Sequence, residues 1–190
     1  MWRNTIGLLL LIYICCGCEQ FSVEPMTEVI TEPSKRDFGF SGQWKEDGKS
    51  GEPLLSFEIE RMDDETKSRY VIKGEHDEFK THHATFTVAE ISAEKNQVIV
   101  EVLVTDNVGR TYRRLAYATI QNDELRITSI NKVLLGELLY AGSVPAVIEH
   151  SMQSSTVRCN PDGLLKVLRE NSEKLPGAAR RFQRIENEGK

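Results

Sequence analysis

Residues 97–105 decide the fold class, and they read QVIVEVLVT. Successive side chains of a β-strand point to opposite faces of the sheet. Alternate valines of this stretch would therefore share one face, and these are Val98, Val100, Val102 and Val104. Ile99 and Leu103 would lie on the other face, on either side of Glu101. Because this is the most apolar of the expected strands, we expect 97–105 to be a central strand.

Shorter segments with the same alternation flank this strand, and turn residues separate them. Leu55, Phe57 and Ile59, for example, alternate with polar residues. The other segments that we expect to be strands are 42–45, 70–74, 83–91, 111–120 and 125–130. A period of two, interrupted by short turns, indicates antiparallel strands rather than βαβ units. We therefore expect a mainly β domain with minor α content, in which an antiparallel meander curls into an open or closed barrel.

The pattern changes to helical spacing after the last of these strands. Two i, i+4 leucine pairs predict a short helix that ends at 142–145, and the pairs are Leu134 with Leu138 and Leu135 with Leu139. Residues 146–158 are interpreted as one or two short extended pieces.

A second short helix is predicted near the C-terminus. Asn160 is a favourable N-cap, because Pro161 suits the first helical position and Asp162 suits the positive end of the helix dipole. The helix should end before Pro176. Three leucines should face the sheet, and these are Leu164, Leu165 and Leu168.

The last residues form a small basic and apolar segment that contains Arg180, Arg181, Phe182, Arg184 and Ile185. We interpret it as a solvated end of the chain. Contact with anionic lipid is the alternative, because cations near such a surface are attracted to it.

The N-terminus carries the pattern of a targeting segment. Arg3 and the terminal amine precede an apolar run from Ile6 to Cys16. This run is shorter than the roughly 20 residues that a membrane-spanning helix needs. It therefore predicts a cleaved signal peptide rather than a permanent transmembrane anchor. An ordinary secretory signal or a short buried helix are the alternatives to the specific signal described next.

Gly17 followed by Cys18, at the end of this run, resembles the lipobox of bacterial lipoproteins. The resemblance implies that residues 1–17 are removed and that Cys18 becomes the first residue and carries the lipid. Glu19, in place of aspartate, implies the outer membrane rather than retention in the inner membrane. Cys15 departs from the leucine that the family usually has three positions before the cysteine. Several acyl chains on one residue make a stable membrane anchor.

Residues 19–37 contain Pro25, Pro33, several acidic residues and few large apolar groups. Because neither a period of 2 nor one of 3.6 is sustained, we expect a flexible linker. A short edge strand at Val29 and Ile30 is the alternative. The expected organisation is a signal peptide over 1–17, the lipidated Cys18 with its tether over 18–37, and a β domain over 38–190.

Removal of the signal and modification of Cys18 would leave Cys159 as the remaining cysteine. No disulfide could then form within the chain. No His or CxxC partner lies near Cys159 in the sequence, so we expect a small buried hydrophobic residue rather than a reactive thiol.

Gly42-Gln43-Trp44, at the opening of the first strand, is similar to the Gly-x-Trp that begins lipocalins, in which the tryptophan closes one end of the barrel. A longer resemblance, in the order and spacing of elements, is to a family of uncharacterised bacterial lipoproteins. It runs from the Gly-x-Trp through an Asp-Gly turn, several strands and a leucine-rich helix to the capped helix after Asn160. This resemblance implies a lipocalin-like β domain on a lipid anchor and implies no activity.

Candidate metal ligands cluster in one stretch of the sequence, and they are Glu75, His76, Asp77, Glu78, His82 and His83. Their spacing matches no zinc pattern, and adjacent histidines on a strand would point to opposite faces. We therefore expect a solvated turn and no metal site.

Candidate catalytic groups do not form a recognisable set. Asp63, Asp64 and Glu65 are adjacent acids in an expected turn, where solvated carboxylates keep their ordinary pKa values. Ser143 lacks the Gly-x-Ser-x-Gly context of a nucleophile, and no phosphate-binding glycine loop is present. We predict no catalytic residue, no cofactor and no enzymatic activity.

The charge balance argues against a nucleic-acid partner. Twenty-four Lys and Arg face 29 Asp and Glu, for a net charge of −5, whereas phosphate binding needs a basic face. Arg113 and Arg114, which are adjacent on an expected strand, would point to opposite faces and form no basic stripe.

The sequence therefore favours a lipid-anchored, non-catalytic protein of the bacterial cell envelope whose β domain binds another protein or has a structural role. The alternative is a carrier that holds a lipid-like molecule inside the barrel, because barrels of about eight strands can hold one such ligand. A filled barrel interior would argue against the carrier, and an open apolar cavity would support it.

Overall fold

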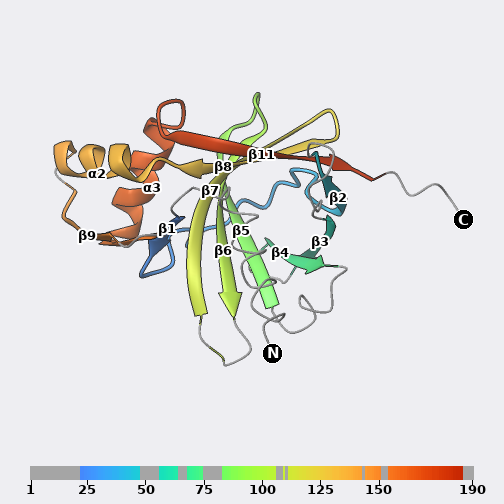
Figure 1. Cartoon of the computed structure of the whole chain (residues 1–190), viewed down its shortest axis with the longest axis horizontal. Coiled ribbons are helices and arrows are strands. Elements are labelled where there is room, and N and C mark those ends of the chain that lie inside the picture. Colours follow the sequence, from blue (N-terminus) through green and yellow to red (C-terminus); the bar gives the residue numbers. More distant parts are fainter. Residues whose placement is uncertain are drawn as a thin grey trace, which may run out of the picture.

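Within the residues that the structure describes, eight antiparallel strands form a closed barrel in the computed structural model of the chain (Figure 1). The described residues are 22–47, 56–63, 68–74, 83–105, 109, 111–142, 144–150 and 154–185. In order around the barrel, the strands are β2 (Gly42–Glu46), β3 (Ser56–Asp63), β4 (Ser68–Gly74), β5 (His83–Ser92), β6 (Gln97–Thr105), β7 (Thr111–Gln121), β8 (Glu124–Ile130) and β11 (Pro176–Arg184). The expected mainly β class is confirmed, with an antiparallel meander that closes into a lipocalin-like barrel.

Strand β6 lies between β5 and β7 and has the bounds that the sequence predicted. Its four alternating valines are buried inside the barrel. On the outer face, Ile99 and Glu101 are also buried, because a second layer of the protein covers this wall. Coverage on both sides is the physical reason for the nearly continuous apolar sequence of this strand.

Strand β11 closes the barrel, which corrects the expectation that residues 180–185 are a solvated end. The strand pairs with β8 on one side and with β2 on the other. Phe182 faces Leu125 and Glu46 in these two ladders, and its ring is fully buried. Arg181 and Arg184 lie on either side of Phe182, so the sequence around it lacks the regular alternation of apolar and polar residues that predicts a strand. The pairing partners lie about 50 to 140 residues away in the chain, so no local turn signal announces this strand.

Three further strands extend the sheet from the outer edge of β7. They are β1 (Ser22–Pro25), β10 (Ser154–Cys159) and β9 (Ala146–His150). Val23 of β1 pairs with Leu115 of β7, while Tyr117, two residues further along β7, pairs with Thr128 of β8. The edge of β7 is thus shared between the barrel and the extension. Strand β1 runs parallel to β10, and β9 is the last strand of the sheet.

Two short helices confirm the expected C-terminal α content, and they are α2 (Lys132–Ala141) and α3 (Pro161–Glu170). Both begin at an asparagine. The side chain of Asn131 accepts a hydrogen bond from the Leu134 amide at 3.1 Å, and that of Asn160 accepts one from Asp162 at 2.9 Å. Such N-caps satisfy amides that have no partner inside the helix. Among the described residues, no helix is long and apolar enough to cross a bilayer.

The helices and β9 lie to one side of the barrel, at the left of Figure 1. Leu164 and Leu168 of α3 are buried there as expected, together with Val167, whereas Leu165 is half-buried. The hydroxyl of Tyr117 on β7 donates a hydrogen bond to the Leu168 carbonyl at 2.9 Å. Burial raises the pKa of this tyrosine far above its ordinary value, so the hydroxyl keeps its proton and fixes α3 to the barrel wall.

Residues 22–37 belong to the fold, and the prediction of a flexible linker for this part is wrong. Ser22–Pro25 is a strand, and Val29 and Ile30 are buried outside any strand. The acidic and proline content suggested a tether. Long-range partners outweigh that composition, since the two buried residues pack on the outer wall of the barrel. The β domain therefore includes residue 22 rather than beginning at residue 38.

Candidate functional site

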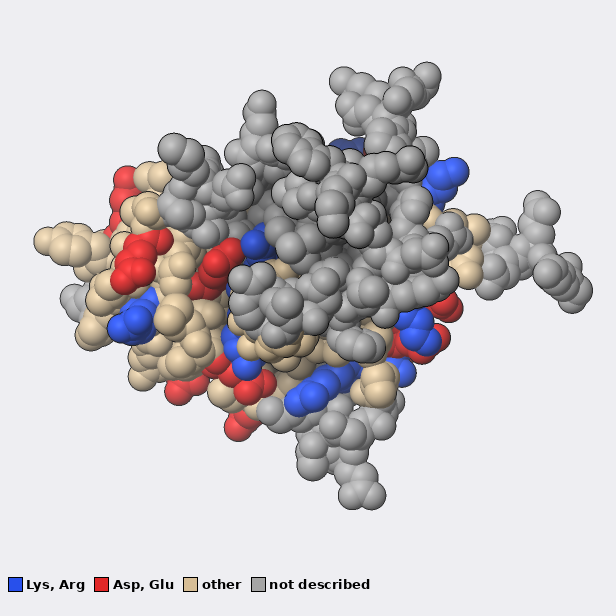
Figure 2. All heavy atoms as spheres, turned by 60° about the horizontal axis from the view of Figure 1, so that its bottom comes forward, with Lys and Arg blue, Asp and Glu red and all other residues tan. Residues whose placement is uncertain are grey.

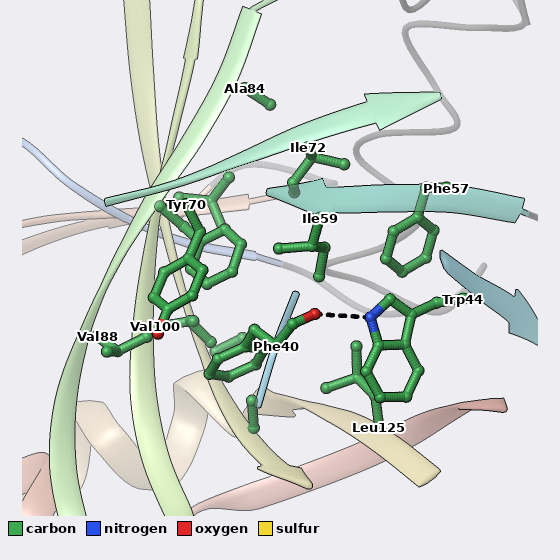
Figure 3. Packing of buried hydrophobic residues seen from close by; sticks show 14 of the residues in the cluster. Phe40, Trp44, Phe57, Ile59, Tyr70, Ile72, Ala84, Val88, Val100 and Leu125 are labelled. Atoms are coloured by element: carbon green, nitrogen blue, oxygen red, sulfur yellow. Dashed lines mark hydrogen bonds between the residues drawn. The ribbon is translucent and has the colours of Figure 1, made fainter. Parts of the chain in front are cut away.

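Within the described residues, apolar side chains from all eight strands pack together inside the barrel. Among the described residues, the cavity there measures about 30 Å³. Its walls are apolar, with Phe40, Phe57, Phe86 and Leu125 among the lining residues, and Figure 3 shows several of these side chains converging on the interior. A volume of this size is close to that of one water molecule, whereas ligand pockets measure roughly 300–1,000 Å³. Among the described residues, this cavity is therefore too small for a lipid-like ligand.

Aromatic rings occupy one end of the interior. The ring of Phe40 packs edge-on against Tyr70 and Phe86, with centroids 5.3 and 5.2 Å apart. The indole of Trp44 is fully buried, and its Nε1 donates a hydrogen bond to the Phe40 carbonyl at 2.8 Å (Figure 3). The tryptophan of the Gly-x-Trp thus ties the segment before β2 to the first strand of the barrel.

Arg184 of β11 stacks on Trp44, and no local pattern in the sequence predicts this contact. Its guanidinium lies 4.4 Å from the Trp44 ring centroid. It donates hydrogen bonds to the carbonyls of Gly39 and Ser41 at 2.7 and 2.5 Å and to Asp123 at 2.9 Å. A planar cation that stacks on an aromatic face and donates several hydrogen bonds suits arginine and not lysine. These contacts tie β11 to the segment before β2 and to the turn between β7 and β8.

The backbone conformation at position 42 and the nearby Arg184 side chain both favour a glycine there. The φ of +134° at Gly42 is a conformation that residues with a side chain rarely adopt. A Cβ at this position would lie 2.6 Å from Nη1 of Arg184. The first residue of the Gly-x-Trp therefore allows the close approach of the arginine to the backbone.

A buried carboxylate holds the segment after β1 on the outer wall. Glu101 of β6 is 2% exposed, and its oxygens accept hydrogen bonds from the amides of Val29 and Ile30 at 2.8 to 3.1 Å. Arg113 of β7 lies 3.6 Å away. Burial raises the pKa of Glu101, although the two amides and Arg113 favour the charged form. Each of these groups has a structural partner, so the cluster serves as an attachment of the 22–37 segment.

A surface hollow of substantial volume lies between α2 and β9. It is an open groove of about 470 Å³, lined by Gly136, Leu139, Tyr140, Val144, Pro145, Ala146 and Ile148. Tyr140 is 91% exposed at its rim, and Val133 and Val147 are exposed nearby on α2 and β9. Within the described sheet, β9 pairs on one side only, with β10. We call this groove and strand the β9 edge.

Most of the residues that the sequence singled out lie outside the described residues, Glu75, Asp77 and Glu78 among them. The same holds for Cys18, His76, His82, Asp64, Glu65 and Ser143. His83 is the first residue of β5, and Asp63 is the last residue of β3. Within the described part of the chain, no three His, Cys, Asp or Glu side chains are placed to hold a metal ion.

The expectation for Arg113 and Arg114 is confirmed, and that for Cys159 is confirmed in part, because this residue is half-buried rather than buried. Arg113 and Arg114 point to opposite faces, since one lies near Glu101 and the other forms an ion pair with Glu24 at 2.9 Å. Cys159 is half-buried in the outer hydrophobic cluster, and burial raises the pKa of its thiol. A raised pKa lowers the fraction of the reactive thiolate.

A serine and a histidine contact each other at the end of β9. Nδ1 of His150 lies 2.9 Å from Oγ of Ser155. Ser155, however, is 1% exposed and sits in the central strand of the β1–β10–β9 extension. A nucleophile needs access to its substrate, so this contact is a cross-strand link between β9 and β10.

Charges on the face of Figure 2 are mixed, with Lys and Arg interspersed among Asp and Glu over the coloured part. Several exposed ion pairs contribute to this pattern, such as Arg36 with Glu90 at 3.1 Å. Among the described residues, the β9 edge combines an open groove with a strand that pairs on one side. Comparison of the chain with protein-family models, with curated proteins and with solved structures finds no match.

Proposed function

We propose that this chain is a lipid-anchored, non-catalytic protein of the bacterial cell envelope, attached through Cys18, whose β domain binds another protein at the β9 edge. The anchor is supported by the short apolar run that ends in Gly17-Cys18. The observation that carries the binding role is an open sheet edge beside an open groove, whose surface is part apolar and part polar. The outer membrane is the proposed location, because Glu19 follows the cysteine.

A protein partner fits the observations better than a small apolar ligand. The interior cavity of about 30 Å³ is smaller than a single fatty-acyl chain requires. The groove at the β9 edge is about 470 Å³ and open to solvent. Ligand pockets usually enclose most of their ligand, whereas an open groove beside a strand suits a polypeptide that extends beyond it.

The β9 edge carries only some of the features that normally protect a free strand, since it is short but has little charge. Charged residues, especially lysine, and bulges discourage edge-to-edge pairing. The described strand carries Ala146, Val147 and Ile148 with one carboxylate, Glu149, and no lysine. An extended segment of a partner can add its backbone to such an edge, with alternate apolar side chains in an adjacent groove. We therefore expect an extended, apolar-rich segment as the occupant.

The anchor is tested by replacing the cysteine that would carry the lipid. In the full-length protein expressed in a bacterial host, Cys18→Ala should move the β domain from the membrane fraction to the soluble fraction. Cys16→Ala is the matched control and should leave the protein in the membrane, with a diacylglycerol-modified Cys18 in its mass spectrum. Equal membrane retention of the Cys18→Ala protein and the parent would rule out the anchor.

The binding role is tested at two side chains of similar exposure. Val147 on β9 is 55% exposed, and Met62 on β3 is 58% exposed. In crosslinking from intact cells, Val147→Lys should lose a crosslinked partner that the parent and Met62→Lys both retain. A lysine at an edge strand opposes the addition of another strand. A crosslinking pattern that Val147→Lys leaves unchanged would show that the β9 edge is not the binding surface.

A further inference from the structure

The position of β1 sets how far the domain can stand from its anchor. Only Glu19, Gln20 and Phe21 separate Cys18 from Ser22, the first residue of β1. A fully extended chain advances at most about 3.6 Å per residue, so the Cα atoms of Cys18 and Ser22 lie within roughly 14 Å of each other. The nineteen-residue tether expected from the sequence would have allowed a much longer and freer reach.

Strand β1 is fixed to the domain rather than laid loosely on it. Its four residues pair in register with β10, and Val23 is buried in the outer cluster. Glu24 forms an ion pair with Arg114 of β7 at 2.9 Å, with both side chains largely buried. Beyond the strand, the Met26 amide donates a hydrogen bond to the Val157 carbonyl at 3.0 Å. Pulling Ser22 away from the sheet would break these contacts, so Ser22 moves with the domain.

The same contacts decide which side of the domain lies next to the anchor. Strand β1 sits between β7 and β10, and β9 follows β10. Neighbouring strands are about 4.8 Å apart, so β9 is on the order of 10 Å from β1. In the circle of eight barrel strands, β3 lies four positions from β7 in either direction, on the opposite wall. Ser154 and His150 lie at the Ser22 end of the extension.

We infer that the lipid on Cys18 holds the β1–β10–β9 side of the domain directly at the bilayer surface, with the β3 wall turned away from the membrane. This inference rests on the proposed lipid anchor. The surface that faces the β1–β10–β9 side of the domain is a phospholipid bilayer. Because β9 belongs to the side held near the membrane, a protein that pairs with the β9 edge meets it close to the lipid headgroups. The orientation follows from chain length and does not require an attractive charge on this face.

The test measures the distance of two labels from lipid headgroups. The full-length protein is processed in its bacterial host, extracted, and reconstituted into phosphatidylethanolamine–phosphatidylglycerol vesicles that carry a short-range quencher on their headgroups. In a Cys159→Ala background, a fluorophore is attached to Glu149→Cys on β9 or to Glu60→Cys on β3. Both glutamates are exposed, and both point away from the barrel interior. Arg158→Cys and Met62→Cys provide a second pair with the same geometry.

A third variant has a longer connection between Cys18 and β1. It carries a Gly/Ser insert of about twenty residues after Glu19, which adds roughly 25 Å of flexible reach. We expect quenching at position 149 to be several-fold stronger than at position 60, and the insert to remove this difference. Flotation of each protein with the vesicles is measured first. Flotation with equal quenching at both positions, or with no effect of the insert, would overturn the inference and leave the anchor intact. Absence of flotation would overturn the anchor, and the inference with it.

Discussion

At the scale of single residues, the junction between β11 and the start of β2 depends on a close contact between a glycine and an arginine. We predict that Gly42→Ala lowers the free energy of unfolding by about 1–3 kcal/mol, because it combines a strained φ with a side-chain clash. The clash is with Arg184, whose Nη1 would lie 2.6 Å from the new Cβ. Chemical denaturation monitored by tryptophan fluorescence measures the change, since the buried Trp44 reports on this junction.

A double-mutant cycle separates the two causes. In an Arg184→Ala background the clash is absent, so Gly42→Ala should cost less there than in the parent. The residual cost would then be the backbone strain at φ +134°. Identical costs in the two backgrounds would show that Arg184 does not constrain this position.

Glu101 gives a prediction with a pH signature. Glu101→Gln keeps one acceptor oxygen, but its amide nitrogen would face an N–H of Val29 or Ile30, so we expect a loss of about 1–3 kcal/mol near neutral pH. Glu58→Gln is the control, because Glu58 lies on the outer face of β3 and is not fully buried. Urea unfolding of the three proteins compares these free energies.

The sign of the pH dependence follows from the raised pKa of Glu101. The folded protein binds this proton more tightly than the unfolded chain, whose carboxyl has the ordinary pKa of 4.5. The contribution of Glu101 to the free energy of unfolding is therefore largest below pH 4.5 and falls as the pH rises from there through the folded pKa. The free energy of unfolding of Glu101→Gln should lack this part of the pH dependence. An equal pH dependence of the free energy of unfolding in the parent and in Glu101→Gln would contradict a raised pKa of Glu101.

At the scale of elements, the strands with local partners could be predicted from the sequence. Strand β6 has the expected bounds of 97–105, and β7 and β8 differ from the expected 111–120 and 125–130 by one residue. These strands join consecutive neighbours through short turns, where the positive φ of Asn96, Asn122 and Asp123 suits residues of that type. The signals for strand, turn and strand all lie within about thirty residues.

The elements that the sequence did not predict have partners far away in the chain. Strand β1 pairs with β10, about 130 residues later, and it is short and contains Pro25. Strand β11 alternates poorly because Ala178, Ala179 and two arginines precede Phe182. Period and turn chemistry describe a segment and its neighbours, and they carry no information on a ladder that forms only after the rest of the barrel exists. For the same reason, the β9 edge and the Arg184 contact could not be predicted.

The helix N-terminus after Asn160 was predictable because its cause is local. The capping side chain, the proline after it and the acidic Asp162 all lie within three positions. The face of the helix was predictable only in part, since Val167 rather than Leu165 is buried. Which flank of a helix meets the sheet depends on how the helix crosses it, and that angle is set by the whole second layer.

At the scale of the whole molecule, the filled barrel separates the proposed binding protein from a carrier. Each of the eight barrel strands contributes buried apolar side chains to the interior, so these contacts stabilise the barrel without a ligand. A protein that binds a ligand only in its folded state gains stability as the ligand concentration rises. We therefore predict that fatty acids and small aromatic compounds leave the melting temperature of the parent unchanged in calorimetry.

Phe86→Ala is the positive control for that measurement and the last prediction. Phe86 lines the interior cavity and stacks on Tyr70 with centroids 4.8 Å apart, so its removal should cost about 3–5 kcal/mol and enlarge an apolar space. Enlarged apolar cavities that stay dry can bind benzene. Benzene should therefore raise the melting temperature of Phe86→Ala and not that of the parent. A rise for the parent with a long-chain fatty acid would mean that the barrel opens to admit it, and the carrier would then replace the binding protein as the better account of this fold.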